Sequence, residues 1–226
     1  MIHRRHAIAL LALLVLTACG GGGGGGGVPS GPFVVYAAIG ASDAVGIGAS
    51  PRSNGYVPVF AERLDASGPA VALRNLGVSG AWAVEMLADQ VPAAIAANPE
   101  VITVWTGSND LVGGEDPAAF GDVLDEMLGR LSDETDAVIL VGNLVAMTET
   151  PRFRDGSDPN VTEDSVNAFN AEIADAVAAN GCVLVNLFIL EVRDDLFWID
   201  GFHPNNAGYQ QLADAYWRAY TLFGAP

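Results

Sequence analysis

Phe33-Val34-Val35-Tyr36-Ala37-Ala38-Ile39 is an unbroken apolar stretch that runs directly into Gly40-Ala41-Ser42-Asp43. A solidly apolar run of this length, ended by glycine, predicts a strand that is buried on both faces. Residues 101–105 have the same character. Strands of this kind are typical of parallel sheets covered by helices on both sides, so the stretch predicts an α/β fold.

Strand-like and helix-like segments alternate along the rest of the chain. We expect strands at residues 33–39, 70–76, 101–105, 137–141 and 183–187, and helices at 56–66, 83–97, 117–131, 163–179 and 206–222. Asp116 is the expected N-cap of the helix at 117–131, and Thr162 or the residue before it that of the helix at 163–179. Residues 144–160, with Pro, Gly and mixed charges, should form a long surface loop. The alternation predicts a three-layer α/β/α sandwich on a five-stranded parallel sheet, in the flavodoxin-like arrangement.

The first 32 residues are not expected to belong to this fold. Residues 1–18 combine a basic start with an apolar run shorter than the about 20 residues that a membrane span needs, which indicates a signal peptide. Leu16-Thr17-Ala18-Cys19 resembles the bacterial lipobox, and this resemblance implies cleavage before Cys19 and lipidation of its sulfur. Residues 19–32 would then be a flexible glycine-rich tether, and residues 33–226 a single domain.

The lipobox resemblance implies attachment in the cell envelope, on the periplasmic side of a bacterial outer membrane. The alternative is an ordinary secretory signal with a chance cysteine, in which case the protein would be secreted. Apart from that lipid we expect no membrane contact, because the formal net charge is −17 and the chain has no lysine. The same acidity argues against nucleic acid as a partner. We expect a monomer.

The cysteine content limits what else the chain can build. With Cys19 lipidated, only Cys182 remains of the two cysteines. No intrachain disulfide and no cysteine-based metal cluster are therefore expected. We also expect no cofactor, because the chemistry proposed below needs none.

Four polar motifs stand where a predicted strand ends or the last helix begins. They are Gly40-Ala41-Ser42-Asp43, Asn75-Leu76-Gly77-Val78-Ser79-Gly80, Thr106-Gly107-Ser108-Asn109-Asp110 and Asp200-Gly201-Phe202-His203. The carboxyl ends of parallel strands meet at one edge of a sheet, so we expect the four motifs to lie together. They supply a hydroxyl, hydrogen-bond donors, a carboxylate and an imidazole, which is a complete set for acyl transfer.

His203 is the only histidine outside the leader, which holds His3 and His6. Any reaction in the domain that needs a general base near neutral pH would therefore use this imidazole. Asp200 lies three residues earlier, and in a tight turn a carboxylate at that spacing can reach the ring and fix its tautomer. Asp194 and Asp195 are rival partners whose spacing fits less well. A plain surface turn is the alternative interpretation of the motif.

The four motifs, in this order, resemble those of the SGNH or GDSL-like hydrolase family over nearly the whole domain. The resemblance implies that Ser42 is the nucleophile, with Asp200 and His203 as acid and base. It also implies an oxyanion hole formed by the amide of Ser42, the amide of Gly80 and the side chain of Asn109. No metal or cofactor takes part in the reaction of that family.

The chain departs from the family's first motif, which usually reads Gly-Asp-Ser-Leu. Here Ala41 replaces the Asp and Asp43 replaces the Leu. The missing Asp is not a member of the family's catalytic triad, so we expect its replacement to leave the catalytic mechanism unchanged. Asp43 is expected to cap the start of a helix rather than to take part in catalysis.

The resemblance implies a serine hydrolase that cleaves carboxylic esters through an acyl-enzyme. We expect small or soluble substrates, including glycan acyl esters, with short acyl chains preferred. Alternatives on the same triad are an O-acyltransferase and a lysophospholipase or thioesterase, and a non-catalytic lipid-anchored binding protein is a further one. The larger α/β-hydrolase fold is disfavoured, because Ala44 stands where its Gly-x-Ser-x-Gly elbow needs glycine.

Overall fold

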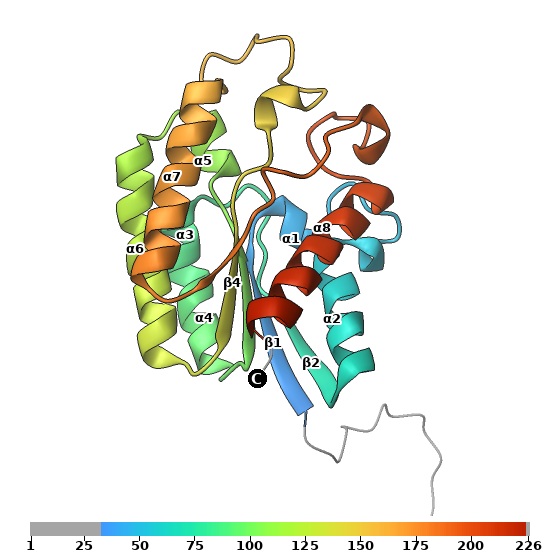
Figure 1. Ribbon diagram of the computed structural model, residues 1–226, viewed down its shortest axis with the longest axis vertical. Helices are drawn as coiled ribbons and strands as arrows, with labels where there is room; N and C mark the ends of the chain where they lie inside the picture. Colours follow the sequence, from blue (N-terminus) through green and yellow to red (C-terminus); the bar gives the residue numbers. More distant parts are fainter. Residues whose placement is uncertain (1–32, 225–226) are drawn as a thin grey trace, which may run out of the picture.

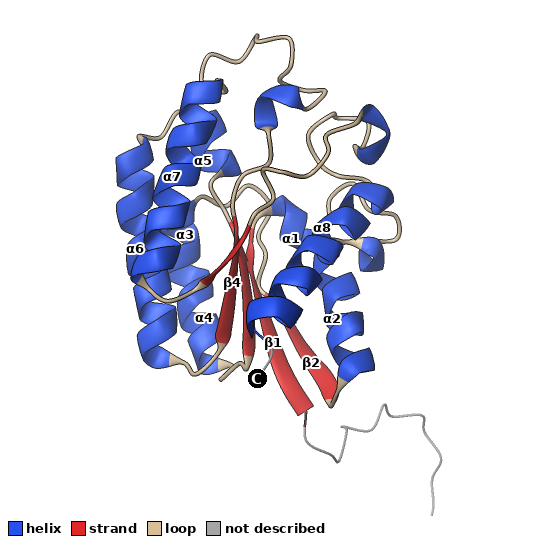
Figure 2. Ribbon diagram, viewed as in Figure 1, coloured by secondary structure: helices blue, strands red, loops and turns tan. Residues whose placement is uncertain are grey.

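The computed structural model of the protein describes residues 33–224. Within them, five parallel strands form one sheet in the order β2-β1-β3-β4-β5 (Figure 1, Figure 2). The strands are β1 (Phe33–Gly40), β2 (Ala70–Asn75), β3 (Val101–Trp105), β4 (Val138–Gly142) and β5 (Val183–Val185). The predicted parallel sheet is confirmed. The predicted signal peptide, Cys19 and the glycine tether lie outside the described residues.

Helices cover both faces of the sheet, as Figure 1 shows. One face carries α3 (Ala83–Glu85), α4 (Val91–Ala96), α6 (Pro117–Glu134) and α7 (Glu163–Ala179), and the other carries α2 (Tyr56–Ser67) and α8 (Asn206–Ala219). Two short helices, α1 (Ser42–Val45) and α5 (Ser108–Gly113), follow β1 and β3. The predicted three-layer sandwich is therefore confirmed. No helix within residues 33–224 has both the length and the apolar character needed to cross a membrane.

The central strand β1 contributes to an apolar core on each side of the sheet. Ala37 and Ile39 pack into the core under α6 and α7, whereas Tyr36 and Ala38 pack into the core under α2 and α8. All four are fully buried. Because successive side chains of a strand point to opposite faces, a strand between two cores must be apolar at every position. This explains the unbroken apolar sequence.

Both predicted helix N-caps are confirmed. The Asp116 side chain accepts the amides of Ala118 and Ala119 at 3.1 and 3.2 Å. The Thr162 hydroxyl accepts the amide of Ser165 at 3.1 Å. These bonds satisfy amides that have no partner inside the helix, and they fix where α6 and α7 begin.

Three predicted elements differ from the structure. The helix expected at 206–222 is α-helical only to Ala219 and continues as a π-helical turn, Tyr220–Gly224. The helix expected at 83–97 contains a π-helical turn, Met86–Gln90, between α3 and α4. Pro92 follows this turn and lacks the N–H that the Ala88 carbonyl would receive in an α-helix. Strand β5 ends at Val185, because the amides of Leu187 and Phe188 donate to Asn143 Oδ1 (2.6 and 3.1 Å) rather than continuing the ladder.

The long loop after β4 is only in part the surface loop that the sequence predicts. Met147 and Phe153 are buried in the core on the α7 side. A short turn of 3-10 helix at Met147–Glu149 brings the first of these side chains inward. The apolar residues therefore anchor an otherwise polar segment, which lies above the carboxyl edge of the sheet (Figure 1).

Candidate active site

Ser42 stands where the chain leaves β1 and α1 begins. Gln90 fixes this point, because its side chain accepts the Gly40 amide at 2.9 Å and donates to the Gly40 carbonyl at 3.0 Å. Asn75, at the end of β2, donates to the Ala44 carbonyl at 2.6 Å. Only 5% of Ser42 is exposed. The serine is thus held on both sides by hydrogen bonds from neighbouring segments.

His203 is placed by a turn that Asp200 organises. Asp200 Oδ1 accepts the amides of Phe202 and His203 at 2.9 and 3.0 Å. Gly201, between Asp200 and Phe202, has φ at +69°, a left-handed conformation that costs glycine little. The residues on either side of the turn form an antiparallel bridge. One carboxylate oxygen therefore builds the turn and leaves the other free for the ring.

The structure brings Ser42, His203 and Asp200 together in one line of hydrogen bonds. His203 Nε2 lies 2.8 Å from Ser42 Oγ, across 161 positions of sequence. His203 Nδ1 lies 2.6 Å from Asp200 Oδ2. With the carboxylate accepting from Nδ1, the ring carries its hydrogen on that nitrogen, and Nε2 is free to accept the serine proton.

The rival carboxylates are engaged elsewhere. Asp194 accepts from both terminal nitrogens of Arg154, at 2.6 and 2.9 Å. Asp195 pairs in the same two-bond manner with Arg193, at 2.9 and 3.0 Å. Both pairs are exposed. The choice of Asp200 as the partner of the imidazole agrees with this geometry.

Asp200 is set to remain ionised. Its partial burial opposes the charged form, but the hydrogen bonds from the His203 ring and from the amides of Phe202 and His203 outweigh that effect. The pKa of Asp200 consequently lies below its usual value. An ionised carboxylate at this position stabilises an imidazolium on His203.

The predicted oxyanion donors lie on the neighbouring loops. Gly80 is exposed on the loop after β2, with φ at +84°, and its amide donates to no group among the described residues. Asn109, in α5, donates one Nδ2 hydrogen to the Ala81 carbonyl at 2.9 Å. A primary amide has two such hydrogens, so the second remains available. The Ser42 amide, the first of α1, has no acceptor within its helix.

Asp110 is a structural member of the site whose role the sequence did not reveal. Its side chain is 3% exposed, and Oδ1 accepts the Ala83 amide at 2.9 Å. Burial raises its pKa. Together with Asn109 it ties the loop after β2 to α5, which holds Gly80 and Asn109 in one place. The motif Gly-x-Asn-Asp signalled a special position here but not this long-range contact.

The expectation that Asp43 caps a helix is wrong. Helix α1 begins at Ser42 and its cap position is Ala41, which leaves Asp43 as the second helical residue with no capping bond. Burial raises the pKa of the Asp43 carboxyl to about 6, with the His203 ring opposing the shift. Tyr209 Oη lies 3.5 Å from Oδ1, but it donates its hydrogen to the Ile47 carbonyl at 2.5 Å.

Asp43→Asn should make the protein more stable near neutral pH. A carboxyl whose pKa rises from 3.8 to about 6 on folding stabilises the fold below 3.8, and this contribution is lost as pH rises through 6. We expect the free energy of unfolding of the variant to exceed that of the wild type by about 1–3 kcal/mol at about pH 8. The gain should shrink towards pH 4. Urea unfolding of both proteins at the two pH values measures it; a gain that does not depend on pH would contradict the assignment.

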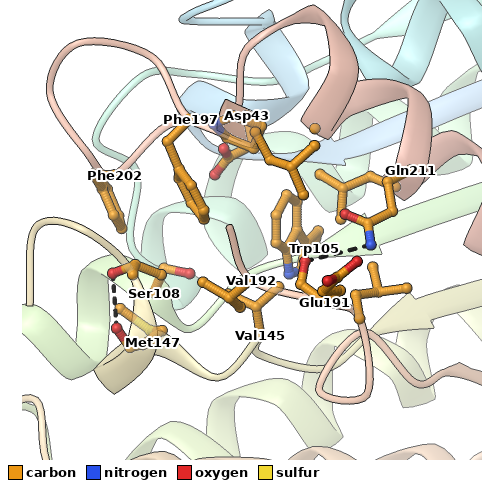
Figure 3. Close-up of a pocket in the computed structure, with 16 residues that line it drawn as sticks. Asp43, Trp105, Ser108, Val145, Met147, Glu191, Val192, Phe197, Phe202 and Gln211 are labelled. Atoms are coloured by element: carbon orange, nitrogen blue, oxygen red, sulfur yellow. Dashed lines mark hydrogen bonds between the residues drawn. The ribbon is translucent and has the colours of Figure 1, made fainter. Parts of the chain in front are cut away.

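A pocket of about 50 Å³ lies near the Ser42–His203 pair, and Figure 3 shows the residues that line it. Asp43 and Pro204, the sequence neighbours of the pair, both line it. Its wall is mostly apolar and comes from loops at the carboxyl ends of β3, β4 and β5; it includes Trp105, Val145, Val192, Leu196, Phe197 and Phe202. A smaller pocket on the Asn109 side shares Asp43 and Trp105 with it. Asp43, which follows Ser42 in the sequence, is therefore part of the wall of both pockets.

Comparison with known families identifies the chain. Residues 38–211 match the model of the GDSL-like Lipase/Acylhydrolase family, and this match covers all four motifs. The chain belongs to this family. The resemblance seen in the motifs is thereby confirmed, and membership makes the protein a carboxylic ester hydrolase.

Solved structures share the fold of this GDSL-like hydrolase. The crystal structure of TesA matches with a TM-score of 0.69 at 24% identity, over 82% of this chain and 97% of that chain. The acetyl xylan esterase AlAXEase matches with a TM-score of 0.66 at 20% identity, over 82% of this chain and 99% of that chain. The psychrotrophic esterase EstA from Pseudoalteromonas sp. matches with a TM-score of 0.67 at 16% identity, over 83% of this chain and 96% of that chain. A search of curated proteins gave no match.

No metal site competes with this interpretation within the described part of the chain. Residues 33–224 contain no group of three or more His, Cys, Asp or Glu side chains arranged to hold an ion. The free thiol of Cys182 is half-buried beside Ser132 and lines neither of the two pockets of the site.

Proposed function

We propose that the protein hydrolyses carboxylic esters of small or soluble acyl groups through an acyl-enzyme formed on Ser42. The observation that carries this proposal is the relay from Ser42 Oγ to His203 (2.8 Å) and on to Asp200 (2.6 Å). A serine hydroxyl is a weak nucleophile at neutral pH, and a base in direct hydrogen-bond contact activates it.

The reaction runs in two halves. In the first, His203 Nε2 takes the hydroxyl proton while Ser42 Oγ attacks the ester carbonyl carbon, and the imidazolium then gives that proton to the departing alcohol. In the second, His203 takes a proton from water, the hydroxide attacks the acyl-enzyme, and the acid leaves as the proton returns to Ser42 Oγ. Asp200 keeps the ring oriented and stabilises its charged form throughout.

The negative charge that develops on the carbonyl oxygen meets three donors in this proposal. They are the amides of Ser42 and Gly80 and the second Nδ2 hydrogen of Asn109. Donors fixed before the reaction need no reorganisation as the charge forms, and one of them typically contributes about 2.7–4 kcal/mol to the barrier. The contact between Asn109 and Ala81 supports this role, because it fixes the amide plane and joins the two loops.

A short acyl group fits the pocket beside Ser42. Its volume of about 50 Å³ is well below the roughly 300–1,000 Å³ of pockets that enclose drug-sized ligands. Similar solved structures include proteins described as an acetyl xylan esterase and an acetyl-xylooligosaccharide esterase. Esters of short acyl groups on a soluble glycan are therefore the substrates that we propose first.

An active-serine probe tests this function directly. A fluorophosphonate should label the wild-type protein on the peptide that contains Ser42 and should abolish esterase activity in proportion to labelling. Ser42→Ala should remain unlabelled and inactive while it keeps the wild-type unfolding midpoint. Equal labelling of the two proteins would remove Ser42 from its proposed role, and a fully labelled protein without esterase activity would favour a binding protein that kept the fold.

A further inference from the structure

Asp43 is the one feature of the site that the hydrolytic mechanism does not use. Helix α1 presents Ser42 to His203 and Asp43 to the apolar pocket, so a carboxylate is part of the wall next to the nucleophile (Figure 3). A carboxylate is costly at such a place, since the surrounding side chains are largely apolar and the residue is only partly exposed to water. A partner in the protein, or one that arrives with a ligand, would lower that cost.

The described part of the protein supplies no strong partner. Beyond its own backbone amide, the only hydrogen bond to the Asp43 carboxylate comes from Tyr209 Oη at 3.5 Å, and that hydroxyl already donates to Ile47. No arginine pairs with Asp43 among residues 33–224, and the chain has no lysine. The titratable groups around it are His203, Asp200 and tyrosines, including Tyr56 on α2 and Tyr216 on α8. His203 is already bound on both ring nitrogens.

Three other polar side chains in the pocket wall are engaged, whereas the uncharged Ser108 hydroxyl has no partner among the described residues. Thr150 Oγ1 donates to the Met147 carbonyl at 2.7 Å, and Glu191 pairs with Arg193 at 3.1 Å. Gln211 contacts the Glu191 carbonyl at 3.4 Å. Asp43 is therefore the carboxylate of the pocket that lacks a counterpart. A plain alkyl chain that filled the pocket would exclude water from the Asp43 carboxylate and leave that carboxylate without a hydrogen-bond partner.

We propose that Asp43 selects esters whose acyl group carries a hydrogen-bond donor, a hydroxyl or an ammonium group, close to the carbonyl. The donor binds the Asp43 carboxylate while the rest of the acyl group contacts the apolar wall. This inference rests on the proposed function, since it assumes the acyl-enzyme at Ser42. It names the class of acyl group that the same site accepts.

The pocket is assigned to the acyl group rather than to the alcohol for a physical reason. The acyl group stays bound through both halves of the reaction, whereas the alcohol must depart in between. A pocket of about 50 Å³, walled by side chains from several loops, suits the part that stays. A large alcohol such as a sugar needs the open side of the site.

Matched esters test the inference. The substrates are p-nitrophenyl butyrate, 3-hydroxybutyrate and 3-aminobutyrate, which differ only in the group at the third carbon. A hydrogen bond to a charged group typically contributes enough for a change of about 10- to 100-fold. We expect the wild type to prefer a donor-bearing ester over butyrate by a factor in this range in kcat/KM. In Asp43→Leu the preference should be lost, with butyrate turned over faster than by the wild type.

Two further variants make the result specific. Asp43→Asn keeps a carbonyl acceptor but no charge, so it should retain part of a preference for the hydroxyl ester and lose one for the amino ester. It also provides the test if Asp43→Leu fails to fold. Glu191→Gln removes the other carboxylate of the pocket wall, which is already paired with Arg193. It should leave the ratio of kcat/KM for each donor-bearing ester to kcat/KM for the butyrate at the wild-type value.

The outcomes separate this inference from the function on which it rests. Hydrolysis that persists in Ser42→Ala would overturn the function itself. Hydrolysis that depends on Ser42, with a hydroxyl-to-butyryl ratio that Asp43→Leu and Asp43→Asn leave at the wild-type value, would overturn only the role of Asp43. A donor preference that appears with varied alcohols instead of varied acyl groups would overturn the assignment of the pocket.

Discussion

Replacing His203 by Gln is expected to lower kcat for ester hydrolysis by roughly 10⁵- to 10⁶-fold, the scale found when the histidine of a serine hydrolase is removed. The reason is that Ser42 Oγ has its only base at 2.8 Å, on His203 Nε2. Residues 33–224 contain no second imidazole that could replace it. Steady-state kinetics on a p-nitrophenyl ester, with prolonged incubation for the variant, measures the loss.

A double variant sharpens this prediction. Groups that act as one unit are strongly non-additive, so Ser42→Ala combined with His203→Gln should lose little more activity than either change alone. Gln210→Ala is a control in the helix that follows: the side chain of Gln210 is exposed and contacts Asp214 at 3.3 Å. It should leave kcat near the wild-type value. A loss of less than 100-fold in His203→Gln, or multiplying losses in the double variant, would contradict the relay.

The sequence predicts the sheet and its active edge because both depend on strong, local signals. Strands buried on two faces must be largely apolar, as β1 and β3 are, with Thr103 the polar exception in β3. Parallel strands put their carboxyl ends on one edge, so residues as far apart as Ser42 and His203 can be expected to meet there. The turn that joins Asp200 to His203 depends only on a spacing of three residues, and it too can be predicted.

The features that the sequence does not predict depend on partners remote in the chain. Gln90 bonds the Gly40 backbone from 50 residues away, and Asp110 bonds the Ala83 amide from 27 residues away. A buried polar side chain has no local pattern that names its partner. Asp43 shows a different difficulty: whether a residue caps a helix or belongs to it depends on a shift of one or two positions.

Asp200→Asn should lower kcat/KM by about 10⁴-fold although it alters the fold very little. Asparagine Oδ1 can still accept the amides of Phe202 and His203, so the turn should persist. Its NH₂ group would replace the oxygen that now lies 2.6 Å from His203 Nδ1. That amide donates and cannot accept, so it favours the ring tautomer with its hydrogen on Nε2, the nitrogen that must take the Ser42 proton.

The comparison with Asp194→Asn isolates this tautomer effect. Asp194 lies in the same loop, but its carboxylate binds Arg154 at the surface, where an ion pair contributes little. Both changes remove one negative charge from the loop, so a general electrostatic effect would act on both variants. If the imidazole tautomer is what matters, only Asp200→Asn loses activity, and its unfolding midpoint stays close to that of Asp194→Asn. Comparable kinetics in the two variants would show that Asp200 does not set the state of His203, and the proposed relay would then reduce to Ser42 and His203 alone.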